Sequence, residues 1–241
     1  MPEGGGGGIV GQFQCPEWAF VFPVEREFQM KILHVMASPQ SNDESISKKM
    51  ALEFFSALME KNPDVEVENL DLYQNKPPFL SNEALRYFWK PVAEPGYVPS
   101  KQEEMAVNYS HNNAPSLADA DVLVITTPVW INGMPAILKA WLDQVIVPGV
   151  MFEAGEDGIK PTHHLQSVVL LVSSSDVYKE GDERDGLTPA IRAVFAYIGV
   201  DDVQIAWADG QDARRHFDAA ERLEVAVDAA KEIAEDLGET P

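Results

Sequence analysis

A hydroxyl-rich segment, ASPQSNDESIS at residues 37–47, separates an apolar run from an amphipathic stretch. Free amide groups at the start of a helix, together with hydroxyl side chains, can bind a phosphate group with little help from basic residues. The candidate phosphate ligands are Ser38, Ser45, Ile46 and Ser47. A simpler alternative is that Ser45 or Ser47 only caps the helix.

A second candidate loop, PVWIN at residues 128–132, follows the apolar run VLVI at residues 122–125. Pro128 ends the run, Gly133 permits a close approach of the backbone, and Pro135 suits the first turn of the next helix. The candidate contacts to a flat ring system are Pro128, Val129, Trp130, Ile131 and Asn132. Trp130 would offer an apolar wall beside the ring, unless it belongs to the core.

Strand-like and helical patterns alternate after residue 30. Strands are predicted at residues 32–37, 65–72, 122–126, 168–172 and 203–208, and helices at 45–59, 101–117, 134–147, 188–198 and 217–237. This alternation is typical of a doubly wound α/β fold with a parallel sheet and right-handed crossovers. The common five-strand order is 2-1-3-4-5, with a ligand crevice beyond the carboxyl ends of the first and third strands. Both candidate loops would open there. The connection at 73–100, rich in proline and aromatic residues, is the main irregular segment expected.

A phosphate at the first loop and a flat ring at the second describe a mononucleotide, for which flavin mononucleotide (FMN) is the best fit. No GxGxxG follows the first strand, which weighs against a dinucleotide fold, and no GxxxxGK[ST] supports a nucleoside triphosphatase. A response-regulator receiver shares this topology, but it would need acidic residues where Ser38 and Pro128 stand. The histidines lack the spacing of metal ligands, so no metal site is predicted.

The composition predicts one globular domain. The chain has 241 residues, 45% of them hydrophobic, and a formal charge of -21. Such an acidic chain argues against nucleic-acid or anionic-membrane partners, because these need a positively charged surface. The acidity would also suit a salt-rich cytoplasm. A single cysteine and the absence of a membrane-length apolar run indicate a cytoplasmic protein. Residues 1–29, which include a glycine run, are interpreted as a poorly ordered or non-essential extension to a domain at residues 30–241.

Further motifs extend from about residue 30 to residue 210. They comprise the loop serines, the PVW sequence, Lys139, Trp141, Asp143, the segment 149–161 and the segment 173–210. On these residues the chain resembles the FMN-dependent NADH-azoreductase and quinone-reductase family, a flavodoxin-like group of homodimers. The resemblance implies bound FMN, NADH or NADPH as donor, and a quinone or azo compound as acceptor. It also implies a ping-pong transfer of two electrons with no catalytic side chain, because the flavin carries the chemistry.

The chain departs from this family at two places. Ile131 stands where the family usually has asparagine, and Asn132 follows one place later. The family's Ser-Arg-Gly-Gly after the fourth strand is replaced here by Ser173, Ser174, Ser175 and Asp176, which the resemblance adds to the candidate cofactor contacts. If Asp176 faces the flavin, its charge would lower the reduction potential. Alternatively, its carboxylate faces solvent or caps a turn.

Two aromatic features keep more than one interpretation. The cluster Tyr87, Phe88 and Trp89 is a candidate dimer surface or substrate lid, or else it packs on its own sheet. Tyr178 could donate a proton to substrate or be a surface hydroxyl. For the whole chain, the alternative functions are a flavodoxin-type electron carrier and an FAD-dependent quinone reductase.

Overall fold

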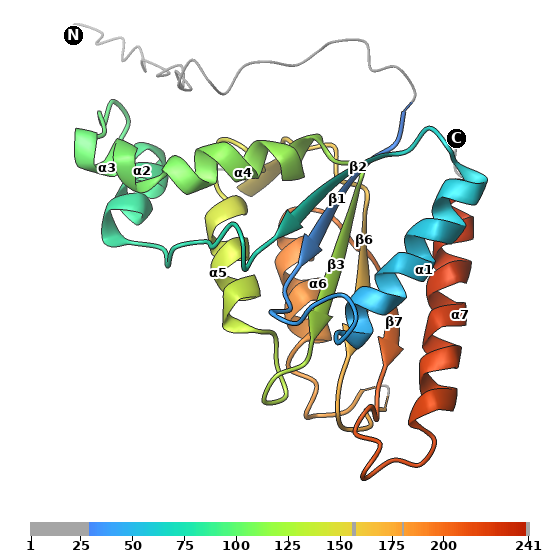
Figure 1. Cartoon of the computed structure of the whole chain (residues 1–241). Helices are drawn as coiled ribbons and strands as arrows, with labels where there is room; N and C mark the ends of the chain where they lie inside the picture. Colours follow the sequence, from blue (N-terminus) through green and yellow to red (C-terminus); the bar gives the residue numbers. More distant parts are fainter. Residues whose placement is uncertain (1–28, 156–157, 180, 240–241) are drawn as a thin grey trace, which may run out of the picture.

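The computed structural model describes residues 29–155, 158–179 and 181–239 (Figure 1). The extension predicted at residues 1–29 therefore lies outside the described residues, apart from Gln29. Five parallel strands form the main sheet, in the order β2-β1-β3-β6-β7. They are β1 (Lys31–Met36), β2 (Glu66–Asp71), β3 (Val122–Pro128), β6 (Ser167–Ser173) and β7 (Asp202–Ala208). The predicted doubly wound order, 2-1-3-4-5, is confirmed.

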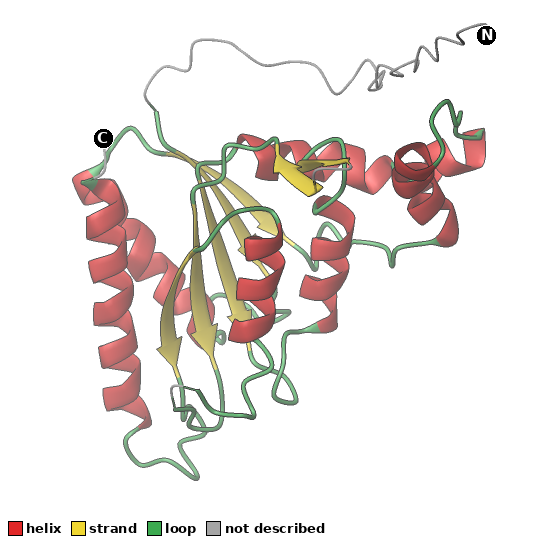
Figure 2. Ribbon diagram, turned by 180° about the vertical axis from the view of Figure 1, so that it is seen from behind, coloured by secondary structure: helices red, strands yellow, loops and turns green. Residues whose placement is uncertain are grey.

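Helices cover both faces of this sheet (Figures 1 and 2). One face is covered by α1 (Ile46–Lys61) and α7 (Ala219–Gly238), which pack side by side. The other face is covered by α4 (Asn108–Asp119), α5 (Ala136–Val145) and α6 (Thr188–Tyr197). The central strands β3 and β6 are apolar on both faces and are buried along almost their whole length, as a parallel sheet between helical layers requires.

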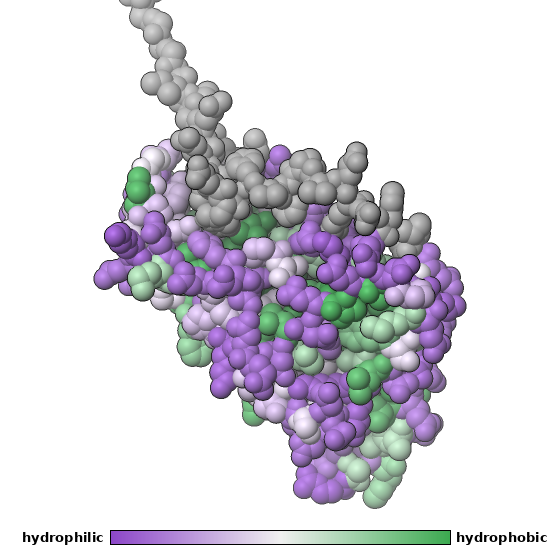
Figure 3. All heavy atoms as spheres, turned by 45° about the horizontal axis from the view of Figure 1, so that its top comes forward, coloured by the Kyte–Doolittle hydropathy of each residue, from purple (hydrophilic) through white to green (hydrophobic). Residues whose placement is uncertain are grey.

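The ends of the described chain lie at the amino edge of the sheet, away from the predicted site. Gln29 lies two residues before β1, and its side chain donates to the Asp64 carbonyl just before β2, at 2.6 Å. At the other end, Gly238 packs against Lys61, where α1 ends. Within the described residues, no helix is both long and apolar enough to cross a membrane. The visible surface at this edge is mostly hydrophilic (Figure 3).

The connection at 73–100 contains a helix that the sequence analysis did not predict, α2 (Asn82–Ala93). Ser81 caps it by accepting a hydrogen bond from the Ala84 amide at 3.1 Å. Ala84, Tyr87 and Phe88 are buried at helical spacing, so the aromatic residues that suggested a loop are the apolar face of an amphipathic helix.

Other boundaries also differ from prediction. The helix expected at 101–117 is divided at Val107 into α3 (Lys101–Ala106) and α4. An antiparallel hairpin of β4 (Phe152–Gly155) and β5 (Gly158–Pro161) follows α5 and was not predicted. The last helix begins at Ala219 rather than at Phe217, which is 99% exposed.

A buried carboxylate, Glu103, joins α2 to α3. Its oxygens accept hydrogen bonds from the Arg86 guanidinium at 2.6 Å, the Tyr97 hydroxyl at 2.8 Å and the Ser100 amide at 2.7 Å. The Glu103 amide in turn donates to the Ser100 hydroxyl oxygen at 3.3 Å, which completes a capping box. The bond from the Ser100 amide and those from Arg86 and Tyr97 lower the pKa of Glu103 to about 2.

We expect Glu103→Gln to destabilise the protein at pH 6, and the difference from wild type to shrink as the pH falls. A carboxylate with a lowered pKa stabilises the fold above its unfolded pKa, and this contribution is lost as the pH falls toward about 2. Urea unfolding at pH 6, 4 and 2.5 measures the effect. The control is Glu104→Gln, because Glu104 is exposed. A pH-independent difference would contradict this role of the Glu103 charge.

Candidate functional site

The first loop lies at the carboxyl end of β1 and leads into α1. Ser45 is the N-cap of α1: its hydroxyl accepts a hydrogen bond from the Lys48 amide at 3.4 Å and lies 3.2 Å from the Ser47 hydroxyl. Within the described structure, the first-turn amides of Ile46 and Ser47 have no hydrogen-bond partner. The start of this 16-residue helix therefore combines free amide donors, hydroxyls and the positive end of the helix dipole.

Capping and ligand binding are both compatible with this geometry. Ser45 does cap the helix, as the simpler interpretation required. Ser47 has only the Ser45 hydroxyl as a side-chain partner. Ser38, Ser45 and Ser47 are all at most 2% exposed, and residues 39–44 form the exposed surface of the loop. An anion at this site would meet the helix start beneath that surface.

Lys48, which the sequence analysis did not single out, holds this loop in place. Lys48 is 6% exposed, and its Nζ donates to the Gln40 carbonyl at 2.8 Å. The same Nζ lies 3.5 Å from the Asp71 carboxylate at the end of β2. The side chain therefore ties the loop after β1 to the neighbouring strand end, and the Asp71 carboxylate partly offsets its positive charge.

The second loop forms a tight hairpin at the carboxyl end of β3. Trp130 and Gly133 exchange two backbone hydrogen bonds, at 2.9 and 3.0 Å. The two residues between them, Ile131 and Asn132, have φ of 49° and 62°, the pattern of a two-residue type I′ turn. A β-branched residue with positive φ is strained, so the position of Ile131 has to be held by its surroundings.

Of the two interpretations of Trp130, the structure excludes a place in the core. The Trp130 side chain is 44% exposed and Ile131 is fully exposed, so neither residue belongs to the core. The Val129 amide donates to the Ser173 carbonyl at 2.8 Å, which anchors the loop to β6. We refer to residues 128–133 as the ring loop. Its exposed indole and its backbone stand beside the loop after β1, because β1 and β3 are adjacent strands.

The loop after β6 contains Ser174, Ser175 and Asp176, which stand where the resembled family has Arg-Gly-Gly. Asp176 does not simply face solvent: its carboxylate pairs with Arg215 at 2.5 Å, an interaction that the sequence analysis did not foresee. Ser174 donates its hydroxyl to the Asp176 carbonyl at 2.8 Å and accepts from the Trp207 indole at 2.9 Å. The charge of Asp176 is therefore partly offset by an arginine, which weakens the predicted effect on a neighbouring flavin.

This loop also contacts the ring loop. The Tyr178 hydroxyl donates to the Asn132 side-chain oxygen at 2.8 Å, and the Gly186 amide donates to the Asn132 carbonyl at 2.8 Å. Tyr178 is therefore not a free surface hydroxyl. Burial raises its pKa, so the hydroxyl stays protonated and able to donate at neutral pH.

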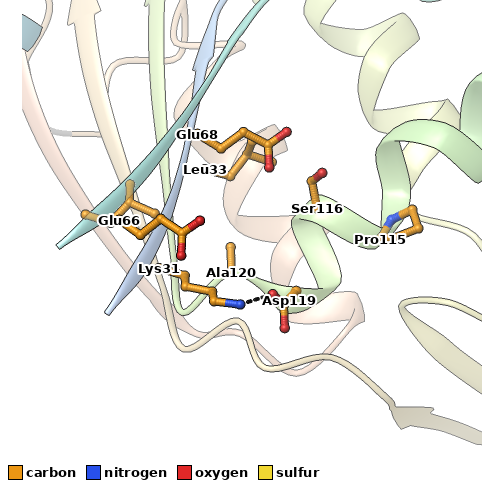
Figure 4. Close-up of a pocket in the computed structure, with 9 residues that line it drawn as sticks. Lys31, Leu33, Glu66, Glu68, Pro115, Ser116, Asp119 and Ala120 are labelled. Carbon is orange, nitrogen blue, oxygen red and sulfur yellow. Dashed lines mark hydrogen bonds and ion pairs between the residues drawn. The ribbon is translucent and has the colours of Figure 1, made fainter. Parts of the chain in front are cut away.

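Two cavities among the described residues lie elsewhere. A cavity of about 360 Å³ at the amino edge is lined by Glu66, Glu68 and Asp119 (Figure 4). Lys31, its one lining cation, already pairs with Asp119 at 2.6 Å. The excess of carboxylates would repel a phosphate, so this cavity does not fit a nucleotide. The described residues contain no group of three or more histidine, cysteine or acidic side chains able to hold a metal ion.

A second cavity, of about 440 Å³, is an apolar groove between α2, α5 and α6. It resolves the interpretation of the aromatic cluster on α2. Tyr87 and Phe88 are buried and pack on their own core, whereas Trp89 is 41% exposed and lines the groove with Tyr197. Only Trp89 therefore remains a candidate for a contact surface.

The family can be assigned from a match over most of the chain. A family model described as a flavodoxin-like fold matches residues 30–233. The chain belongs to this flavodoxin-like family. A relative named FMN-dependent NADH:quinone oxidoreductase, from Coprothermobacter proteolyticus, is 27% identical over 85% of this chain and 98% of its own length. A relative of the same name from Hydrogenovibrio crunogenus is 30% identical over 74% of this chain and 87% of its own.

Solved structures show the same flavodoxin-like fold. An FMN-dependent NADH-azoreductase from Bacillus anthracis, solved in complex with FMN, has a TM-score of 0.75 to this chain at 21% identity. The alignment covers 88% of this chain and all of that one. The flavodoxin-like fold and the family resemblance expected from the sequence are thereby confirmed.

Proposed function

We propose that the protein is an FMN-dependent oxidoreductase that passes two electrons from NADH or NADPH to a quinone or an azo compound. The observation that carries the proposal is the pairing of two loops at adjacent strand ends. The free amides of α1 lie in the loop after β1, and the exposed Trp130 lies in the loop after β3. In this fold the crevice for a flat, phosphate-bearing ligand lies between those strand ends.

The first loop would hold the phosphate of FMN. The donors are the amides of Ile46 and Ser47 and the hydroxyls of Ser38, Ser45 and Ser47, with the helix dipole favouring negative charge. Lys48 would support this site by holding the loop in place through Gln40 and Asp71. This donor set suits an anion in a chain of net charge -21, because it relies on local dipoles rather than on the overall field.

The ring loop would orient the flavin ring. Its backbone is fixed by the Trp130–Gly133 hydrogen bonds and by the bond from Val129 to β6. Trp130 would cover the ring and exclude water, and Ser173 to Asp176 would approach its edge from β6. When bound, FMN supplies the redox chemistry itself, so the side chains act by binding, orientation and shielding.

Homodimerisation is part of the proposal. The apolar groove between α2, α5 and α6 supports it, because Trp89 and Tyr197 leave apolar surface open to a second copy. Sedimentation equilibrium would give twice the mass of one chain. A monomer at micromolar concentration would remove this part of the proposal.

The function is tested by the visible spectrum of the purified protein, followed anaerobically after NADH or NADPH and then benzoquinone, with the flavin released and identified. We expect FMN that bleaches with the nicotinamide donor and recovers with the quinone. FMN that neither donor bleaches would instead indicate an electron carrier, and released FAD would indicate the FAD-dependent class. A protein that takes up no flavin would exclude all three.

We expect Ser47→Ala to weaken FMN binding by about tenfold or more, because a hydrogen bond to a charged group contributes roughly 1.5–3 kcal/mol. Its stability should change little, since Ser47 does not cap α1. Ser45→Ala is the comparison: it should weaken FMN binding as well, and loss of the N-cap should also cost about 1 kcal/mol of unfolding free energy. Fluorescence titration of the apoprotein with FMN and urea unfolding separate the two roles. Unchanged affinity in Ser47→Ala would restrict this serine to a structural role.

A further inference from the structure

We infer that Tyr178 is a positioning residue that locks the ring loop through Asn132, and so sets the affinity of the protein for its flat ligand. The inference rests on the proposed function for the identity of that ligand, FMN. Tyr178 and Asn132 are 46 residues apart in the chain, and their side chains meet through the hydroxyl-to-amide hydrogen bond of 2.8 Å.

The ring loop needs such a lock because its conformation is strained. Ile131 and Asn132 both have positive φ, and Ile131 is fully exposed, so its own side chain contributes no packing to hold the turn. Asparagine is among the residues that tolerate this region of φ, whereas isoleucine is not. The contacts made by Asn132 therefore add to the Trp130–Gly133 backbone hydrogen bonds in stabilising both residues of the turn.

Tyr178 is itself held rigidly enough to act as a lock. Its ring stacks on Trp207 of β7, with centroids 4.8 Å apart and an interplanar angle of 27°. The Arg184 guanidinium carbon lies 5.1 Å from the centroid of the same ring. The Tyr178 amide donates to the Asp209 carboxylate at 2.9 Å. The hydroxyl is thus presented to Asn132 from a fixed platform, which lowers the entropy lost when the bond forms.

The contacts of Tyr178 and Trp207 connect the carboxyl ends of β3, β6 and β7. Trp207 donates its indole N–H to Ser174 after β6, and Tyr178 reaches from that same loop to the ring loop after β3. A ligand bound against the ring loop would therefore meet a backbone already fixed in position. Such preorganisation raises affinity by reducing the ordering cost of binding.

Tyr178→Phe is the decisive variant, because it removes the hydroxyl and keeps the ring that stacks on Trp207. The matched control is Tyr109→Phe, which likewise removes one hydroxyl hydrogen bond, the bond of 3.1 Å to the Asn75 carbonyl, outside the ring loop. The first readout needs no flavin: amide hydrogen exchange of the peptide containing Trp130 and Gly133, whose amides are bonded across the hairpin. We expect about fivefold faster exchange in Tyr178→Phe only, as for loss of one ordinary hydrogen bond.

The second readout is the FMN dissociation constant, which we expect to rise about fivefold in Tyr178→Phe and to stay unchanged in Tyr109→Phe. Asn132→Gly removes the acceptor and tolerates positive φ, so adding Tyr178→Phe to it should cause no further loss of affinity. Wild-type exchange and affinity in Tyr178→Phe would overturn the inference, as would equal effects of both tyrosine variants. If wild type binds no FMN, the proposed function fails, and hydrogen exchange alone decides the lock.

Discussion

Gly186→Ala is expected to weaken FMN binding by about tenfold and to lower the unfolding free energy by roughly 1–3 kcal/mol, the usual cost of overpacking. A methyl group at residue 186 would lie 2.7 Å from the Asn132 carbonyl oxygen, which is closer than Cβ atoms come to backbone. The backbone fixes the positions of both the Cβ atom and the carbonyl oxygen, so no rotamer change can relieve the clash. The ring loop has to move, and the hydrogen bond from the Gly186 amide to Asn132 is strained or lost.

Gly155→Ala is the matched control, because nothing lies within 4 Å of a Cβ built there and its φ is ordinary for an L-residue. Calorimetric titration with FMN and urea unfolding of both variants measure the two effects separately. Binding and stability equal to wild type in Gly186→Ala would show that the close approach at Asn132 is not a constraint.

Lowering the pH from 7 to 4 is expected to cost the fold on the order of 3 kcal/mol through His34 alone. His34 lies on β1, 5% exposed, with one ring nitrogen 2.8 Å from Asn69 Oδ1 and the other 2.8 Å from Thr126 Oγ1. Burial, opposed by the bond to Asn69 and assisted by the nearby Lys48 charge, lowers its pKa from 6.5 to about 4. Between these values the unfolded chain binds a proton that the native state does not, so stability falls as the pH falls.

Urea unfolding of wild type and His34→Gln at pH 7, 6 and 5 tests this expectation. His34→Gln should be less stable than wild type at pH 7, because glutamine cannot reach both partners. The gap should narrow toward pH 5, since only wild type carries the titrating imidazole. Other groups titrate equally in both proteins and cancel in the difference. A gap that stays constant or widens would contradict a neutral, buried His34.

The sheet could be predicted from sequence because its signal is local. Runs such as residues 122–125 and 168–172 are apolar on both strand faces, and their alternation with helices leaves few topologies. The helix α2 was missed for the opposite reason. The connection that contains it is rich in proline and aromatic residues, and only the burial of Ala84, Tyr87 and Phe88 shows the apolar face of a helix. The β4–β5 hairpin was missed because its strands are four residues each.

The sequence indicated the two loops of the candidate site, but not the residues that hold these loops in place. The structure brings the loop serines and the ring loop to adjacent strand ends, as the fold requires. The residues that tie these loops down, Lys48, Tyr178 and Gly186, act through partners 8 to 54 positions away, or on a neighbouring strand end. Pairings of that kind leave no periodic trace in a single sequence. Asp176 is an example, since its partner Arg215 follows a different strand.

The placement of Gln29 and Gly238, near the two ends of the described residues, bears on how the protein can be handled. Gln29 and Gly238 both lie at the amino edge, one β-strand length, roughly 20 Å, from the candidate site. A linker attached before Gln29 or after Gly238 would therefore leave the carboxyl edge facing outward. Tethering to an electrode through either end would present the ring loop to dissolved acceptors rather than to the support.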